Sequence, residues 1–245
     1  PHMHLLEAVL ALHGTTGQAE DMTLAHTLYA LFKNHFLDQK TGTLGEYFQA
    51  GWAPAAGDAG QWIEPGHHFE WVWLLHAYTA QTGVETREQA DRLYRFALEY
   101  GVDTRTALVR DGVSRNGQVL SNAARLWVQG EALRGILRHD ARSNGLLAAR
   151  VGENLLARYL HGPQPCASAQ ATWTDQLDAQ GQPAAERIPT SSFYHIVTAY
   201  DELDRAVRAY RATKPPASTR RTLTAGGKHL PQAHAITLPQ VSRPR

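Results

Sequence analysis

The spacing of apolar residues along the chain predicts helices almost throughout. Apolar side chains recur at intervals of three and four in one segment after another, which is the pattern of a helix with one buried face. Proline at a first turn and glycine after a last turn mark several boundaries. From these signals we predict helices over residues 2–13, 19–37, 65–81, 86–100, 122–139, 143–160 and 191–213. The fold is therefore expected to be all-α.

The connections between these helices alternate in length. Short turns join the helices in pairs, whereas long segments separate the pairs, at 38–64, 102–121 and 161–189. This pattern is typical of a helical hairpin repeated about every 60 residues, with an elaborated connection on one side. In a closed ring of such hairpins, the long connections gather at one end, where the following helices begin. The first turns of those helices would then face a common mouth.

The charged residues divide the chain into a body and a tail. Residues 213–245 contain six Lys or Arg and no Asp or Glu, while residues 1–212 contain 18 Lys or Arg against 23 Asp or Glu. The tail is also rich in Pro, Gly and Thr, so we predict a folded domain at 1–212 and a basic, disordered tail at 213–245. A nucleic-acid-binding domain carries its basic residues on folded elements. We therefore expect no nucleic-acid partner.

Composition restricts the class of protein further. With 245 residues, 43% of them hydrophobic, the chain can bury a substantial core. Its single cysteine, Cys166, excludes a disulfide framework and fits a reducing compartment. No apolar stretch reaches the roughly 20 residues of a membrane helix, and the first residues lack the features of a signal peptide. We expect a cytoplasmic protein without a membrane partner. Because the first residue is Pro1, we also expect either a cloning remnant or a longer parent protein.

Histidines lie in the first turns of three predicted helices. Steps of 63, 58 and 70 residues lead from His4 to His67, Arg125 and His195, in agreement with the hairpin repeat, and Trp127 follows Arg125 closely. These groups are therefore expected to converge at the common mouth. Because the start of a helix disfavours imidazolium, we expect the histidines to be neutral and available as bases.

The stretch EPGHHFEWVWLL, residues 64–75, places polar groups in front of an apolar run. The run has no polar face, which predicts a helix buried on all sides. His67 and Glu70 share one face of that helix, with Trp71 beside them. A helix cap and a structural hydrogen bond would also explain them, but an unpaired buried carboxylate costs several kcal/mol and favours a functional interpretation. His68 points elsewhere and is expected to be structural.

The segment HMHLLEA repeats this theme, with His4 and Glu7 three positions apart. A metal site formed by His2 and His4 is disfavoured, because residues two apart diverge on a helix. The chain also contains no HExxH, no CxxC and no clustered acidic loop, so we expect no metal.

The two remaining motifs leave structural explanations open. In SSFYHIVTAYDEL, a core histidine would explain His195, and in RLWVQGEAL, packing and surface pairing would explain Arg125 and Glu131. Glu46, Trp173 and Asp175 lie in connections that face the expected mouth, where an aromatic ring can stack on a sugar. The chain contains no phosphate-binding glycine loop and no GxSxG motif, so neither nucleotide binding nor that class of hydrolase is supported.

Four motifs of the chain resemble the N-acylglucosamine 2-epimerase family, which includes mannose isomerases, sulfoquinovose-type isomerases and cellobiose 2-epimerases. They are PHMHLLEA, EPGHHFEWVWLL, RLWVQGEAL and SSFYHIVTAYDEL, in this order, within residues 1–205. PGHxxEWxWLL is the most specific of them. The resemblance implies an (α/α)6 barrel with a monosaccharide in its central pocket, and proton transfer without a metal or another cofactor.

The resemblance also implies roles for individual residues. His67 matches the histidine of the PGH motif and His195 the histidine near the C-terminal end, which are the general acid and base of the family. His4 matches a histidine that assists ring opening or holds the substrate. Glu7 and Glu70 match carboxylates that orient the sugar or the histidines. Arg125 and Trp127 fall in the substrate-binding RLW segment.

The chain departs from the family pattern in length. The family barrel has about twelve helices, whereas the chain supplies about seven and begins near the middle of the pattern. The resemblance therefore implies only the C-terminal half to two-thirds of the barrel. Half a ring exposes apolar helix surface, which favours a homodimer or association with a missing N-terminal half.

Two alternative functions remain open from the sequence. One is an (α/α)-barrel glycoside hydrolase that uses two of the carboxylates Glu7, Glu70, Glu131 and Asp175. The other is a truncated, inactive helical scaffold whose histidines have no function.

Overall fold

The computed structural model describes residues 2–161, 173–185 and 187–213. Cys166 and the predicted tail lie outside the described residues, apart from Thr213 at the end of the last helix. Within the described ranges, no helix combines the length and apolar character that crossing a membrane requires.

Long helices form the framework, as the apolar spacing predicts. They are α1 (His2–Thr16), α2 (Ala19–Leu31), α4 (Pro65–Thr82), α5 (Arg87–Phe96), α6 (Leu126–Asn154) and α7 (Ser192–Thr213). Wider, π-type turns extend α2, α5 and α6, at Phe32–Phe36, Ala97–Gly101 and Leu155–Leu160. The first long connection contains a 3₁₀ turn, Ala50–Trp52, and the short helix α3 (Gly57–Gln61).

Helix α6 combines two predicted helices and starts later than predicted. Asp140 and Asn144 have non-helical backbone angles, so a kink divides α6 between the predicted segments 122–139 and 143–160. The predicted start at residue 122 is wrong. Strand β4 (Ala124–Arg125) pairs antiparallel with β5 (Gln176–Leu177), and this pairing holds the backbone extended up to Leu126.

Short strands also occur in the long connections, where the sequence pattern predicts none. Strands β1 (Trp62–Ile63), β2 (Gly112–Ser114) and β3 (Val119–Ser121) form an antiparallel sheet in the order β1-β2-β3. Trp62 pairs with Ser114 and Ile63 with Val113. Strands of two or three residues are too short to show the two-residue period by which strands are recognised.

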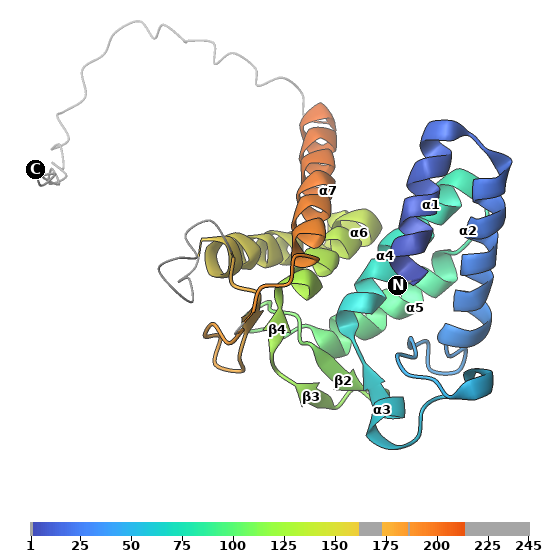
Figure 1. The fold of residues 1–245 in the computed structure, drawn as a ribbon. Helices are drawn as coiled ribbons and strands as arrows, with labels where there is room; N and C mark the ends of the chain where they lie inside the picture. The colour runs from blue at the N-terminus through green and yellow to red at the C-terminus, as the bar shows by residue number, and fades with distance from the viewer. Residues whose placement is uncertain (1, 162–172, 186, 214–245) are drawn as a thin grey trace, which may run out of the picture.

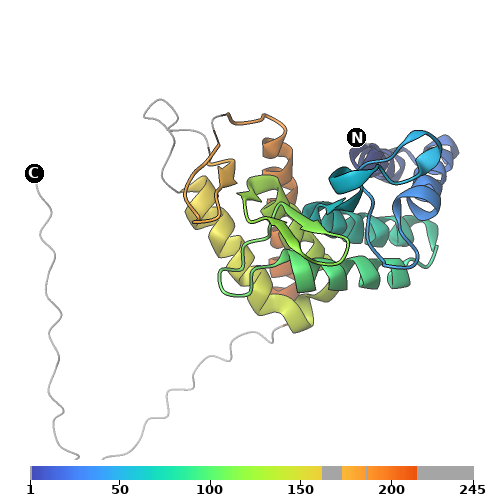
Figure 2. The same cartoon turned by 90° about the horizontal axis from the view of Figure 1, so that it is seen from below.

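The helices follow one another around part of a ring. Helix α4 packs on α6 at the centre, α1 packs on α4, and α7 packs on α6 (Figures 1 and 2). Helices α2 and α5 form the outer layer against α1 and α4. Figure 1 shows that α1 and α7 begin on the side of the molecule where the small strands lie. The predicted gathering of helix starts and long connections at one end is therefore confirmed.

Helix α4 is buried over most of its length, as its sequence predicts. Phe69, Trp71 and Leu74 are fully buried, and the Trp71 indole stacks on Phe32 with ring centroids 3.9 Å apart. Since its neighbours pack around it, α4 can hold the side chains of its first turns rigidly at the end where the long connections gather.

Candidate active site

A pocket of about 300 Å³ lies where the helix starts converge. Its lining comes from α1, α4, α6, α7 and the segment before α7: His4, His67, Glu70, Arg125, Trp127, Asp175, Pro189, Ser191, Ser192 and His195. The volume is at the lower end of the range for ligand pockets. Of the seven site residues predicted from the sequence, the structure brings all but Glu7 to this pocket.

His67 lies in the first turn of α4 and binds a carboxylate from the first long connection. Its Nδ1 atom is 2.8 Å from Oε2 of Glu46, and Glu64 lies 3.9 Å from the same nitrogen. Burial lowers the pKa of His67, but Glu46, followed by Glu70 and Glu64, raises it to about 9. The prediction of a neutral histidine is thus wrong for His67, because these carboxylates outweigh the effect of the helix start.

His195 has a similar arrangement on α7 with a different carboxylate. Its Nδ1 atom is 2.7 Å from Oε1 of Glu131, and both side chains are buried. Because a carboxylate only accepts hydrogen bonds, the Nδ1 atom carries the proton. The Nε2 atom of a neutral ring is then unprotonated and available to a molecule in the pocket.

Glu131 is a residue for which surface pairing was an open explanation, and that explanation is wrong. The side chain is fully buried, and Nη1 of Arg134 donates to both of its oxygens at 3.0 and 2.8 Å. Burial would raise the pKa of Glu131, but Arg134 and the hydrogen bond from His195 hold it below the usual value. Glu131 is therefore an ionised acceptor for the histidine.

Trp127 lies beside both histidines. The centroid of its indole is 5.0 Å from the His67 ring and 5.6 Å from the His195 ring. Gly66 makes this approach possible, because a Cβ atom at that position would lie 2.7 Å from the indole. The two imidazoles thus share one aromatic wall of the pocket.

His4 and Glu70 form the part of the pocket nearest α1. The His4 ring lies 5.4 Å from that of His195, and its Nε2 atom is 4.0 Å from Oε1 of Glu70. Burial, followed by the charge of His195, lowers the pKa of His4, so this ring is neutral near pH 7. Glu70 is only 1% exposed, and burial, followed by the charge of Glu131, raises its pKa to about 8. A neutral carboxylic acid therefore faces the pocket, which explains how a buried carboxyl group persists there.

Arg125 is the residue directly before α6, and two carboxylates bind its guanidinium. Its Nη2 atom donates to Glu64 at 3.0 Å, and its Nε atom lies 3.2 Å from Asp111. The guanidinium carbon lies 5.1 Å from the centre of the Trp127 ring. The positive charge of Arg125 is thus already balanced at the edge of the pocket.

Three further residues discussed in the sequence differ in their positions: Asp175, Glu7 and His68. Asp175 lines the pocket and accepts hydrogen bonds from Ser192 and Trp173. Glu7 lies away from the pocket lining and binds Arg134 and Tyr194. His68 is structural, as predicted: its Nε2 atom accepts a hydrogen bond from the backbone N–H of Leu44.

Metal ligands do not gather in the part of the chain that the structure describes. No three side chains of His, Cys, Asp or Glu there come together as a metal site requires. The lining of the described pocket supplies imidazoles, carboxyl groups, one guanidinium, hydroxyls and an indole.

Comparison with known proteins assigns the family. The model for N-acylglucosamine 2-epimerase (GlcNAc 2-epimerase) matches residues 1–199. The chain belongs to the N-acylglucosamine 2-epimerase family. A curated relative, the mannose-6-phosphate isomerase of Rhizobium meliloti (strain 1021), is 33% identical over 217 residues, which cover 85% of this chain and 55% of the relative.

Solved structures show that the N-acylglucosamine 2-epimerase fold is shared. Cellobiose 2-epimerase from Bacillus thermoamylovorans B4167 superposes with a TM-score of 0.67 at 20% identity, over 84% of this chain and 52% of that one. A D-mannose isomerase gives a TM-score of 0.65 at 18% identity, over 83% and 55%. The chain thus spans about half the length of these proteins, and its helices correspond to about half of their (α/α)6 barrel.

Proposed function

We propose that the protein takes part in metal-independent proton transfer next to the carbonyl group of a monosaccharide, as an isomerase or 2-epimerase of mannose-like or N-acylglucosamine-like sugars. The observation that carries this proposal is the pair His67 and His195. Each has its Nδ1 atom bound to a carboxylate, and both line one pocket beside the same indole. Two oriented imidazoles facing one ligand are suited to accept and donate protons.

The chemistry requires a base of suitable pKa and stabilisation of the enediolate. A proton next to a sugar carbonyl is weakly acidic, so its removal needs a correctly placed base. In the proposal, the unprotonated Nε2 atom of His195 takes the proton. His67, whose pKa of about 9 makes it an imidazolium, donates a hydrogen bond or a proton to the oxygen or carbon that becomes negative.

His4 and Glu70 fit the opening of the sugar ring. A neutral imidazole accepts a proton from a hydroxyl, and a neutral carboxylic acid donates one to the ring oxygen. Epimerisation results if protons leave and return on opposite faces of C2. Isomerisation results if one group moves the proton from C2 to C1 on the same face.

We propose an unphosphorylated sugar as the ligand of the described pocket. Arg125 is the only arginine in the pocket lining, and Glu64 and Asp111 already balance its charge. Free arginine donors are one common means of binding a phosphate group, and Arg125 is already paired. Mannose should therefore be used in preference to mannose 6-phosphate.

The glycoside hydrolase alternative has less support from the geometry. Glu7 lies outside the pocket lining, and Glu131 is fully committed to His195 and Arg134. The pair Glu70 and Asp175 would remain, with Asp175 bound by Ser192.

We also propose that full activity requires a complete ring of helices. The two end helices, α1 and α7, carry apolar side chains that are largely exposed: Leu5, Leu12, Phe193, Val197, Tyr200 and Tyr210. Tyr200 is 71% exposed. In the proposal, these side chains pack against a further element of the ring. The relatives, which are about twice as long as the part matched, support further helical hairpins as that element.

Incubation with sugars in deuterated water tests the function. Mannose, N-acetylglucosamine and mannose 6-phosphate are each incubated with the protein and EDTA, and deuterium at C1 and C2 is followed by NMR. The same assay is run on a polypeptide that spans the whole barrel. Incorporation from mannose in EDTA supports the proposal. Exchange that requires an added metal, or hydrolysis of a disaccharide without exchange in the complete barrel, would overturn it.

A further inference from the structure

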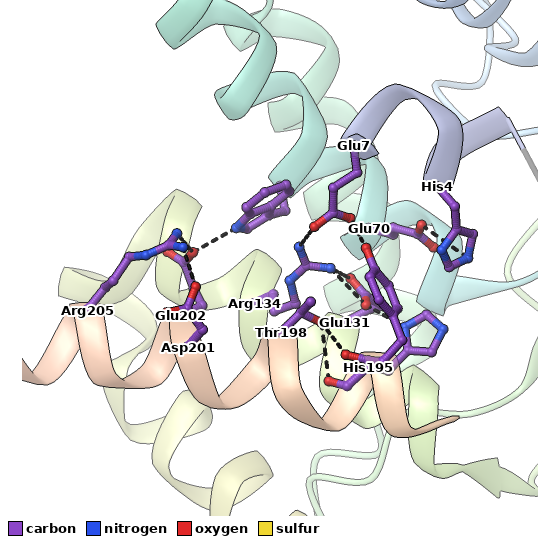
Figure 3. A network of polar contacts seen from close by, with 12 residues as sticks. His4, Glu7, Glu70, Glu131, Arg134, His195, Thr198, Asp201, Glu202 and Arg205 are labelled. Carbon is purple, nitrogen blue, oxygen red and sulfur yellow. Dashed lines mark hydrogen bonds and ion pairs between the residues drawn. The ribbon is translucent and has the colours of Figure 1, made fainter. Parts of the chain in front are cut away.

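A buried arginine is linked to His195 through Glu131. Arg134 is 1% exposed, and its guanidinium carbon lies 4.1 Å from the centre of the Trp73 ring. Besides the two bonds to Glu131, its Nη2 atom donates to Oε1 of Glu7 at 2.6 Å. Figure 3 shows this cation between the carboxylates of Glu7 and Glu131, with the His195 ring on the other side of Glu131.

The cluster joins three helices at the base of the pocket. Glu7 comes from α1, Glu131 and Arg134 from α6, and Tyr194, which donates to Glu7, from α7 directly before His195. The chain of bonds from Tyr194 through Glu7, Arg134 and Glu131 ends at His195 (Figure 3). The histidine is therefore held by its own helix and by a buried ion network.

We propose that Arg134 is a positioning residue: by keeping Glu131 ionised, it places the proton of neutral His195 on Nδ1 and leaves Nε2 free to act on the ligand. The use of Nε2 in proton transfer rests on the proposed function. The position of the proton is a property of the resting protein and is measurable without a substrate.

The physical reason lies in the charges of the cluster. Glu131 and Glu7 are two carboxylates around one guanidinium, and Glu70 raises the negative charge further when it ionises. A buried carboxylate without a counter-charge takes up a proton, because the low-dielectric surroundings penalise its ionised form. A protonated Glu131 would donate to Nδ1 of His195, and the ring proton would then move to Nε2. That tautomer cannot accept a proton from a ligand in the pocket.

Long-range ¹H–¹⁵N NMR determines the tautomer of His195 in the free protein and tests the proposal. With Arg134 intact, the neutral ring should carry its proton on Nδ1. In Arg134→Met the proton should move to Nε2, whereas Arg134→Lys, which keeps a cation beside Glu131, should retain it on Nδ1. If Arg134→Met does not fold, Arg134→Gln carries the same expectation, because its amide brings no charge. An unchanged tautomer in the uncharged variant would overturn the proposal and leave Arg134 with a purely structural role.

A matched control is Arg205→Met. Arg205 lies on α7, where it pairs with Asp201 and Glu202 of the same helix, and Figure 3 shows it apart from Glu131. Its loss should leave the tautomer of His195 as it is. A change of equal size in this control would also overturn the proposal.

Kinetic measurements extend the test to the complete barrel. Arg134→Met should lower kcat of deuterium exchange by up to about 10⁴-fold, the effect of a wrong histidine tautomer, with KM nearly unchanged. Its activity should recover as the pH rises and Glu131 ionises. If the tautomer shifts as expected but the complete barrel shows no deuterium exchange, the proposed function is wrong, whereas the effect of Arg134 on the tautomer stands.

Discussion

The two histidines of the pocket occupy similar places in two hairpins but differ in their electrostatic surroundings. Both lie at the start of a helix, and both bind a carboxylate through Nδ1. The carboxylate of His195 also binds a buried guanidinium, whereas that of His67 meets the histidine and the backbone N–H of Glu64. The first pair is balanced by a cation, and the second lies among further carboxylates.

This difference explains how two histidines can have different chemical roles. An imidazolium is stabilised where negative charge is in excess, so the pKa of His67 rises to about 9. At His195, Arg134 neutralises part of the negative charge of the neighbouring carboxylate, Glu131. We therefore assign the role of proton donor to His67 and that of acceptor to His195. The partner of the carboxylate, rather than the carboxylate itself, separates the roles.

Removal of either imidazole is the largest perturbation of this comparison. In the complete barrel, His67→Asn and His195→Asn should each lower deuterium exchange by about 10²- to 10⁴-fold, the usual contribution of a general acid or base. Circular dichroism should show that the helices remain. His35→Asn is the control, since His35 is exposed and lies outside the pocket lining. Full activity in both pocket variants would remove the histidine mechanism.

The fold and the positions of these histidines are predictable from local patterns. The segment PGHHFEWVWLL shows a proline start and a buried run, Gly83 marks the stop, and α4 ends within a residue of the predicted boundary. The regular intervals between His4, His67, Arg125 and His195 predict the convergence at one pocket, because each interval is one hairpin. Such signals depend only on neighbouring residues or on a repeat.

The partners of the histidines are not predictable in this way. Glu46 reaches His67 from a connection whose course depends on short strand pairings, and these have no readable period. Glu131 and Arg134 are three apart on a helix, which looks the same in the sequence as an exposed ion pair. Only the packing of α6 between α4 and α7 makes that pair buried and places it against His195.

Glu70 lines the same pocket as the two histidines, and its substitution is expected to have the next largest effect, on stability. Its pKa is about 8 in the folded protein against an ordinary value of 4.5. The unfolded chain loses this proton at lower pH than the folded one does, so the stabilisation is complete below pH 4.5 and is lost progressively up to pH 8. Glu70→Gln mimics the protonated form and should become more stable than the unaltered protein, by on the order of 3 kcal/mol, as the pH rises from about 5 to 8.

Urea unfolding at both pH values measures this difference. The raised pKa of His67 adds a loss of stability between pH 6.5 and about 9. Because Glu70 is one of the charges that raise this pKa, the difference between the two proteins measures Glu70 together with its coupling to His67. Glu153→Gln, at an exposed position of α6, should show no such divergence. Parallel curves for Glu70→Gln and the unaltered protein would mean that Glu70 is ionised in the fold.

A smaller effect is expected from the carboxylate that holds His67. Glu46→Gln removes the nearest negative charge, so the pKa of His67 should fall from about 9 toward its ordinary value of 6.5. NMR titration of the ring measures this shift. In the complete barrel, a fall of the pKa to about 7 should lower exchange at pH 8 by about tenfold, because the protonated fraction of His67 then drops from roughly 0.9 to roughly 0.1. An unchanged titration would show that Glu46 does not set the charge of His67.

The smallest effect is expected at Glu64, and it sharpens the comparison most. Glu64 lies 3.9 Å from Nδ1 of His67, but its Oε2 atom accepts a hydrogen bond from Arg125 at 3.0 Å. Like Glu131, it is a carboxylate shared between a histidine and an arginine, so most of its charge is balanced. Glu64→Gln should therefore lower the pKa of His67 by less than Glu46→Gln does. A shift as large as that of Glu46→Gln in the same titration would show that a neighbouring arginine does not weaken the influence of a carboxylate on its histidine, and the different roles of His67 and His195 would then need another cause.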